Sequence, residues 1–243
     1  MEEYVYSHLY QVEKEHWWYA ARAGILMQYI ASRIPTTAET RVLDVGCGTG
    51  AILELLSQRY RAFGTDLSPQ AIGFCRKRGL TNLHAGTLGT YPATEPFDII
   101  TMFDMLEHVD DDPGLLREAY TRLREGGFLL IAVPAYPALW SNLDVVLHHK
   151  RRYTRASLER VVVSSGFRIQ HITFMNTLLF PLALIRRAAA RVFRTDTSHD
   201  LVIPSARINR FLKRIFELEA GMVSRGSLPV GLSLVCLAQR PPR

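Results

Sequence analysis

The chain of 243 residues predicts an α/β fold in which helices cover both faces of a doubly wound, parallel sheet. Short apolar segments alternate along the chain with longer segments whose apolar residues follow helical spacing. The first apolar segment leads into a glycine-rich turn, which is where such sheets bind ligands. Hydrophobic residues make up 48% of the chain and charged residues 21%. This composition supports a packed core and excludes intrinsic disorder and disulfide-rich scaffolds.

Strands are expected wherever a short apolar run lies between turn residues. These runs cover residues 41–45, 61–65, 97–102, 128–133, 167–174 and 232–238. The run 128–133 follows two glycines, Gly126 and Gly127, and its unbroken apolar character is typical of a central parallel strand.

Helices are expected between these runs because their apolar residues recur every three or four positions. They cover residues 13–33, 51–60, 113–124, 158–165, 177–194 and 205–224, and a further helix begins at Ser68 and Pro69. Serine before proline is a frequent helix start, since serine caps the first turn and proline suits the first helical position. The helices 177–194 and 205–224 form an insertion before the last strand.

The cysteines and the N-terminus suggest a cytoplasmic protein. Cys47, Cys75 and Cys236 are scattered and odd in number, which argues against a disulfide framework or a thiolate metal site. The N-terminus is acidic and no signal-peptide core follows it. The most apolar window, 173–185, is shorter than the roughly 20 residues that cross a bilayer. We expect it to be buried or interfacial.

The segment around Gly46, Gly48 and Gly50 predicts a nucleoside cofactor site. Glycines allow the backbone to approach a ligand closely, and the helix that follows offers free N–H groups. Asp66 lies 20 residues after Gly46, at the end of the second strand, where a carboxylate accepts hydrogen bonds from ribose hydroxyls. Asp44 would repel a diphosphate but suits an ammonium group. The pattern therefore favours S-adenosylmethionine, with a nicotinamide cofactor as the alternative.

Three blocks carry a resemblance to a known family: VLDVGCGTG at 42–50, GTDLSPQAI at 64–72 and PFDIITMFDMLEHVDD at 96–111. Through them the chain resembles class I S-adenosylmethionine-dependent methyltransferases, from Val42 to the strand at 167–174. The resemblance implies a Rossmann-like sheet of seven strands. We further expect one domain over 1–243, with an N-terminal helical lid (1–40), a cofactor-binding core (41–174), a helical insertion (175–230) and the last strand (231–243). The aromatic residues near the N-terminus either cover the pocket as a lid or belong to the core.

The resemblance also implies which residues bind the cofactor. The methionine end would contact Asp44, Gly46, Cys47, Gly48 and Gly50, the ribose Asp66, and one adenine face Leu67, while Phe103 and Met105 would line the site beside the sulfonium. The acidic residue that the family often places after the third strand is absent, and Thr87 and Leu88 stand there. We expect Thr87 or a backbone carbonyl to replace it. Arg22, near the aromatic residues Trp17, Trp18 and Tyr19, is a candidate partner for the cofactor carboxylate.

Methyl transfer to a hydroxyl needs a base to accept the proton. The candidates are His108, His148, His149, His16 and Tyr19. The two adjacent histidines open a basic loop, 148–153, after the fifth strand, at the sheet edge where ligands bind. This loop is either an acceptor site or a solvated surface.

Asp104, Glu107 and His108 lie at spacing i, i+3 and i+4, on one side of a helical turn. Some metal-dependent O-methyltransferases, including those of ubiquinone synthesis and of small-RNA 3′ ends, have a similar ExxEH arrangement here. A divalent cation at these residues, with His148 or His149 as a further ligand, would acidify an acceptor hydroxyl. In metal-free relatives the histidine packs near the cofactor instead, and that is the reading we prefer.

Charge is divided unevenly along the chain. Residues 1–149 carry 12 Lys and Arg against 18 Asp and Glu, whereas residues 150–243 carry 17 against 5. The basic part includes the helices 177–194 and 205–224, which combine apolar faces with arginines. Such helices lie on an anionic membrane, cover an apolar acceptor pocket or form a dimer face. Nucleic acid is a less favoured partner, because no aromatic residues alternate with the basic ones.

These observations predict a methyltransferase that acts on an oxygen of a small-molecule acceptor, a hydroxyl or a carboxylate, in a biosynthetic pathway. An anionic or hydrophobic acceptor fits the basic, amphipathic insertion. The alternatives are a membrane-surface methyltransferase with a lipid-linked substrate, a catalytically silent cofactor-binding scaffold and a nicotinamide-dependent dehydrogenase.

Overall fold

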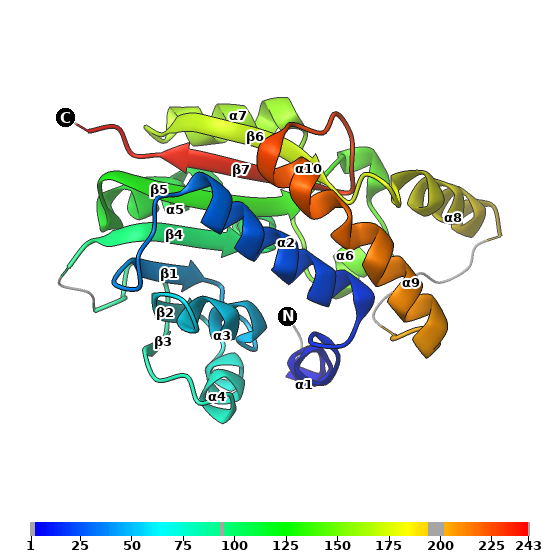
Figure 1. Ribbon diagram of the computed structural model, residues 1–243, viewed down its shortest axis with the longest axis horizontal. Coiled ribbons are helices and arrows are strands. Elements are labelled where there is room, and N and C mark those ends of the chain that lie inside the picture. Colours follow the sequence, from blue (N-terminus) through cyan, green and yellow to red (C-terminus); the bar gives the residue numbers. More distant parts are fainter. Residues whose placement is uncertain (1–2, 93–94, 194–201, 243) are drawn as a thin grey trace.

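The computed structural model describes residues 3–92, 95–193 and 202–242. Within these residues, seven strands form one sheet in the order β3-β2-β1-β4-β5-β7-β6 (Figure 1). Strand β7 runs antiparallel to its neighbours β5 and β6, and the other paired strands are parallel. The strands are β1 (Arg41–Val45), β2 (Arg61–Asp66), β3 (Leu83–Ala85), β4 (Phe97–Phe103), β5 (Leu123–Pro134), β6 (Arg168–Met175) and β7 (Ser233–Gln239). This is the predicted doubly wound α/β fold.

Helices cover both faces of the sheet, and each face has its own core. The helices are α1 (Glu3–Val12), α2 (Trp17–Arg33), α3 (Ala51–Ser57), α4 (Pro69–Lys77), α5 (Asp112–Arg122), α6 (Asn142–Val146), α7 (Arg155–Ser164), α8 (Phe180–Phe193), α9 (Ala206–Glu217) and α10 (Glu219–Arg225). Apolar residues of α2, α3, α4, α9 and α10 pack on one face of the sheet. Those of α5 and α7 pack on the other.

The two ends of the chain differ in detail from the sequence-based expectation. The helix expected over 13–33 begins only at Trp17, because His16 caps it, and the unexpected helix α1 precedes it. The helix expected over 205–224 is divided at Leu218 into α9 and α10. The buried carboxylate of Glu219, at the start of α10, accepts a hydrogen bond from the backbone N–H of Leu178 at 2.7 Å. The described residues between β6 and β7 thus form three helices, where two were expected.

Helix α9 lies against the start of α2, although the two are far apart in the sequence (Figure 1). The side chain of Asn209 accepts a hydrogen bond from the backbone N–H of Trp17 at 2.8 Å and donates one to the carbonyl of Glu15 at 2.8 Å. The N-terminal helices and the insertion are thus joined above one edge of the sheet. Among the described helices, none combines the length and apolar character that a membrane span needs.

Candidate functional site

A large cavity lies at the edge of the sheet where the parallel strands β1, β2, β4 and β5 end. Its volume is about 1450 Å³, more than the roughly 300–1,000 Å³ of an ordinary small-molecule pocket. The loops after these strands form its floor, and residues of α1, α2, α6, α8 and α9 form its walls. The cavity therefore has room for a second molecule beside a nucleoside cofactor.

The glycine-rich turn after β1 runs along the cavity in left-handed conformations. The φ angles of Gly46, Gly48 and Gly50 are +74°, +54° and +88°. A Cβ on Gly46 would lie 2.4 Å from Cγ of Met105, so this position also needs glycine for space. Gly46, Cys47 and Gly48 line the cavity, whereas Gly50, predicted with them as a cofactor contact, is not among the lining residues and is the N-cap of α3.

Asp44, at the end of β1, presents a buried carboxylate to the cavity. Its Oδ1 accepts a hydrogen bond from the hydroxyl of Thr101 at 2.7 Å. Burial nevertheless raises the pKa of Asp44 to about 7, since a buried carboxylate without a cationic partner is costly. An ammonium group in the cavity would supply that partner.

Asp66 ends β2 on the neighbouring side of the cavity. Its Oδ2 accepts a hydrogen bond from the backbone N–H of Gly48 at 2.9 Å, and its Oδ1 accepts one from Ser68 at 2.9 Å. These bonds fix the carboxylate beside the glycine-rich turn. Leu67 is 70% exposed and lines the cavity together with Thr87 and Leu88, which places the three predicted adenine contacts around one part of it.

Arg22, the predicted partner of the cofactor carboxylate, lies on α2 and lines the cavity. Its Nη2 lies 2.9 Å from Oδ1 of Asp104. The guanidinium also lies 5.2 Å from the ring centre of Trp18 and 5.8 Å from that of Phe103. Its buried Nε has no hydrogen-bond partner, so Arg22 retains a donor for an anionic group.

His149 is held by a buried carboxylate that the sequence did not single out. Its Nδ1 lies 2.9 Å from Oδ1 of Asp144, a residue of α6. Arg152 donates to both oxygens of Asp144, at 2.7 and 2.9 Å. Burial raises the pKa of Asp144, but the hydrogen bonds from His149 and Arg152 outweigh it and hold this pKa well below its ordinary value. Asp144 is therefore ionised and accepts the Nδ1–H of His149, which leaves the lone pair on Nε2.

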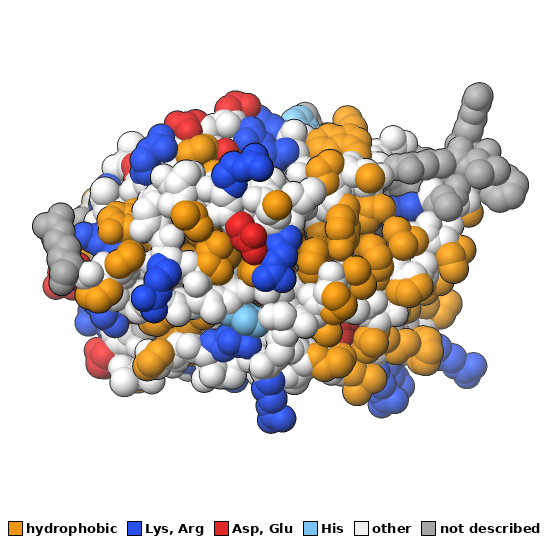
Figure 2. Space-filling view, turned by 90° about the horizontal axis from the view of Figure 1, so that it is seen from above, with side chains coloured by type: hydrophobic (Ala, Val, Ile, Leu, Met, Phe, Trp, Pro, Cys, Tyr) orange, Lys and Arg blue, Asp and Glu red, His pale blue; other side chains and the backbone are white. Residues whose placement is uncertain are grey.

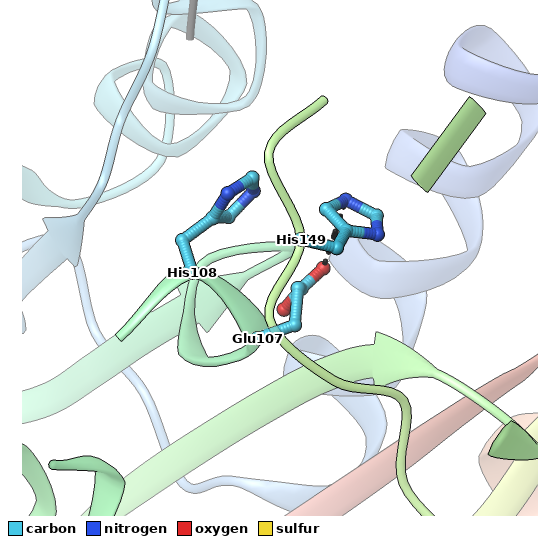
Figure 3. A group of neighbouring side chains, drawn as sticks. All are labelled: Glu107, His108 and His149. Carbon is cyan, nitrogen blue, oxygen red and sulfur yellow. Dashed lines mark ion pairs between the residues drawn. The ribbon is translucent and has the colours of Figure 1, made fainter. Parts of the chain in front are cut away.

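Glu107 and His108 lie beside the free nitrogen of His149 (Figure 3). Oε1 of Glu107 is 3.8 Å from Nε2 of His149, and one nitrogen or oxygen from each of the three residues lies within 4.8 Å of the others. Glu107 is fully buried and neither of its carboxylate oxygens has a hydrogen-bond partner. Burial, and secondarily the charge of Asp104, raise its pKa well above the ordinary value.

The remaining predicted bases differ in their surroundings. Burial, with a smaller contribution from His149, lowers the pKa of His108 to about 4, so its ring is neutral. Burial raises the pKa of Tyr19 far above its ordinary value, which leaves a phenol that donates but does not accept a proton near neutrality. Nδ1 of His16 accepts the backbone N–H of Trp18 at 3.3 Å as the cap of α2. His148 lines the cavity with φ at +58°.

Sequence reasoning overlooked two further buried residues, one that pairs with His149 and one that lines the cavity. Asp144 was recognisable only through its capping box with Ser141, which marks a helix start and not a site. Asn176 follows β6 with φ at +61°, and both polar atoms of its fully buried amide lack a hydrogen-bond partner. Because Asn176 lines the cavity, these atoms are available to a bound molecule.

The comparisons agree with this geometry. A family model described as a methyltransferase domain matches residues 19–172. An uncharacterized protein of Mycobacterium tuberculosis is 31% identical over 196 residues, which cover 75% of this chain and 65% of the relative. The ubiquinone biosynthesis O-methyltransferase of Xylella fastidiosa is 35% identical over 118 residues, 44% of this chain and 47% of that enzyme. The chain thus spans less than two thirds of the length of either relative.

Solved structures share the fold. An S-adenosylmethionine-dependent methyltransferase of Clostridium acetobutylicum matches with a TM-score of 0.60 at 14% identity, over 92% of both chains. Phosphoethanolamine N-methyltransferase 2 of Haemonchus contortus, in complex with S-adenosyl-L-methionine, matches with a TM-score of 0.56 at 18% identity. That match covers 90% of this chain and 52% of the other. With the family model matching well over half of its length, the chain belongs to the class I S-adenosylmethionine-dependent methyltransferases.

Proposed function

We propose that this methyltransferase transfers the methyl group of S-adenosylmethionine to an oxygen of a small-molecule acceptor, a hydroxyl or a carboxylate, in a biosynthetic pathway. The observation that carries the proposal is His149, which lines the cavity and pairs with the buried carboxylate of Asp144. An acceptor hydroxyl must lose a proton when it is methylated, and the pair supplies a base for it. The similarity to a ubiquinone biosynthesis O-methyltransferase supports oxygen as the acceptor atom.

In the reaction, the acceptor oxygen attacks the methyl carbon from the side opposite the sulfur. The bond between carbon and sulfur breaks, and its electron pair remains on sulfur, which becomes the neutral thioether of S-adenosylhomocysteine. The hydroxyl proton passes to Nε2 of His149, and the resulting imidazolium is stabilised by the ionised Asp144. Most of the remaining acceleration comes from holding the two molecules in line.

The cofactor is placed by the groups already described. Asp44 takes the ammonium group and Arg22 the carboxylate of its methionine end, while Gly46, Cys47 and Gly48 bring backbone close to it. Asp66 binds the ribose, and Leu67, Thr87 and Leu88 surround the adenine. Phe103 and Met105, which line the cavity, would lie beside the sulfonium when the cofactor is bound.

A divalent cation is a second candidate component, and the orphaned carboxylate of Glu107 favours it. Glu107, His108 and His149 offer one carboxylate and two imidazoles, a set that binds first-row metals. Asp104, expected as a ligand from its spacing, pairs with Arg22 and is not in this group. A bound cation would lower the pKa of an acceptor hydroxyl. Titration calorimetry with Mn²⁺ tests this, since heat that Glu107→Gln abolishes supports the site and absence of heat excludes it.

The proposed reaction is tested by incubating the chain with S-adenosylmethionine and a panel of hydroxyl-, carboxyl- and amine-bearing acceptors. Mass spectrometry of the products shows which atom carries the added methyl group. Methylation of hydroxyl or carboxyl compounds supports the proposal. Methylation of amines alone, or tight binding of S-adenosylhomocysteine with no methylated product from any acceptor, contradicts it.

A further inference from the structure

The helices of the insertion expose an unusual amount of apolar surface. Ile185 of α8 is 67% exposed, Phe211 of α9 is 64% exposed and Leu218, at the junction of α9 and α10, is 69% exposed. Leu182, Val202 and Ile208 are each more than half exposed as well. We call these six residues the α8–α10 patch. Figure 2 shows hydrophobic side chains gathered at the end of the molecule that carries α8. Exposed apolar patches of this kind mark interaction sites in soluble proteins.

The exposure of α9 follows from its sequence, because two of its sides are apolar. Leu212 and Phe216 point toward the core beside α2. Ile208, Phe211 and Leu218 follow helical spacing along an adjoining side, which faces solvent. The hydrogen bonds of Asn209 to Trp17 and Glu15 fix the rotation of α9 about its axis. This second apolar side therefore does not turn toward the core.

Basic residues border the apolar side of α9. Arg207, Arg210 and Arg214 are exposed and occupy positions i, i+3 and i+7, which lie along one side of a helix. They belong to residues 150–243, which contain 17 basic and 5 acidic residues. An apolar side flanked by arginines is the pattern of helices that lie in the interface of an anionic bilayer, with apolar side chains among the acyl chains and cations at the headgroups.

The patch also forms the rim of the methyltransferase cavity. Leu182, Val202 and Ile208 are exposed members of the patch and at the same time line the cavity. Ala183 and Leu212, from the same helices, continue this apolar wall inward. A molecule that leaves an apolar phase at the patch would thus meet apolar side chains where it enters the cavity.

We propose that the α8–α10 patch docks the enzyme on an anionic phospholipid bilayer, so that the cavity opens toward the membrane and receives an apolar acceptor from it. The docking itself is independent of the proposed methyl transfer, whereas the delivery of an acceptor rests on it. A second copy of the chain fits the patch less well. In a two-fold dimer the same surface meets itself, and the arginine rows of the two copies would lie near each other, whereas an anionic bilayer offers a negative headgroup to each arginine.

Vesicle co-sedimentation of the full chain tests the docking. The chain is expected to sediment with vesicles of phosphatidylcholine and phosphatidylglycerol at low ionic strength. It should remain in solution with phosphatidylcholine alone or at high salt, because the attraction to anionic lipid is screened. The double variant Arg207→Gln/Arg210→Gln should bind the anionic vesicles roughly 25-fold more weakly, at about fivefold for each basic side chain.

The apolar contribution is tested with Ile185→Glu/Phe211→Glu, which should abolish sedimentation. Neither residue lines the cavity, so titration calorimetry should show unchanged affinity for S-adenosylmethionine and thereby an intact fold. Val163→Glu is the matched control, since Val163 is 57% exposed on α7, on the other face of the sheet. Arg168→Gln, at the exposed start of β6, is the control for charge.

Three results would overturn the proposal. The first is a wild-type chain that does not sediment with anionic vesicles. The second is equal loss of sedimentation in the control variants. The third is a dimer in analytical ultracentrifugation that Phe211→Glu dissociates, which would assign the patch to a second copy. A chain that binds vesicles but methylates no acceptor would contradict the proposed function and leave the docking intact.

Discussion

His149 and Asp144 are five residues apart in the sequence and meet as a hydrogen-bonded pair, with Nδ1 of the histidine 2.9 Å from Oδ1 of the aspartate. The aspartate comes from α6 and the histidine from the loop that follows it. Arg152 donates hydrogen bonds to both oxygens of the same carboxylate. The carboxylate thereby determines which nitrogen of the imidazole carries the proton.

Asp144→Asn should reduce turnover about 10²- to 10⁴-fold while cofactor affinity is retained, because the amide no longer fixes the tautomer of His149. Steady-state kinetics and calorimetry with S-adenosylmethionine measure the two quantities. Arg152→Met is the matched control, since it breaks the same buried ion pair but keeps the bond between Asp144 and His149. It should lower the free energy of unfolding and preserve turnover of the folded protein. Equal loss of turnover in both variants would assign Asp144 a purely structural role.

Asp44 makes cofactor binding depend on pH. Its pKa of about 7 in the free protein means that the carboxyl is protonated below this pH and must lose its proton to bind an ammonium group. The affinity for S-adenosylmethionine should therefore fall about tenfold for each pH unit below 7. In Asp44→Asn the affinity should be about 10- to 100-fold weaker at pH 8 and should not show this fall. If calorimetry shows the same pH dependence of the affinity for S-adenosylmethionine in both proteins, Asp44 is not the partner of the ammonium group.

The same shift has the opposite consequence for the stability of the free protein. A carboxyl whose pKa rises from 3.8 to about 7 on folding stabilises the fold most below pH 3.8, and this contribution disappears as the pH rises through 7. Asp44→Asn should thus be more stable than the wild type at pH 8 without cofactor. Urea unfolding of the wild type and of Asp44→Asn at pH 8, without cofactor, measures the difference between their free energies of unfolding.

Arg22 is expected to recognise the carboxylate of the cofactor through its unpartnered Nε. Arg22→Gln should weaken binding of S-adenosylmethionine about 10- to 100-fold, the contribution of a hydrogen bond between charged groups. Decarboxylated S-adenosylmethionine lacks the group in question, so its affinity should be the same for variant and wild type. If both ligands lose affinity equally, Arg22 acts only through its ion pair with Asp104.

Two glycines of the cofactor turn should respond differently to the addition of a methyl group. Both have positive φ, but a Cβ would lie 2.4 Å from Cγ of Met105 at Gly46 and would meet no atom within 4 Å at Gly48. Gly48→Ala should cost about 1–2 kcal/mol of unfolding free energy from backbone strain alone. Gly46→Ala should cost about 1–3 kcal/mol more, from overpacking. If urea unfolding shows the same loss of unfolding free energy in both variants, the side chain of Met105 moves aside freely.

The sequence was sufficient for the sheet and the cofactor loop because both depend on local patterns. Apolar runs predicted six of the seven strands, and the short β3 lacks such a run. The glycine spacing, together with Asp44 and Asp66, predicted a turn that the structure shows lining the cavity. Asp144 and Asn176 escaped notice because their importance arises from burial and from neighbours distant in the chain. The division of the last long helix at Leu218 depends on the tertiary bond between Glu219 and Leu178.

The catalytic use of His149 is the central claim, and a single-turnover measurement tests it most directly. Enzyme saturated with S-adenosylmethionine is mixed with a hydroxyl compound that the panel identifies as an acceptor, and the formation of S-adenosylhomocysteine is followed in time for the wild type and His149→Gln. The variant should bind the cofactor with unchanged affinity and transfer the methyl group about 10²- to 10⁴-fold more slowly. Transfer at the wild-type rate by His149→Gln would contradict this assignment.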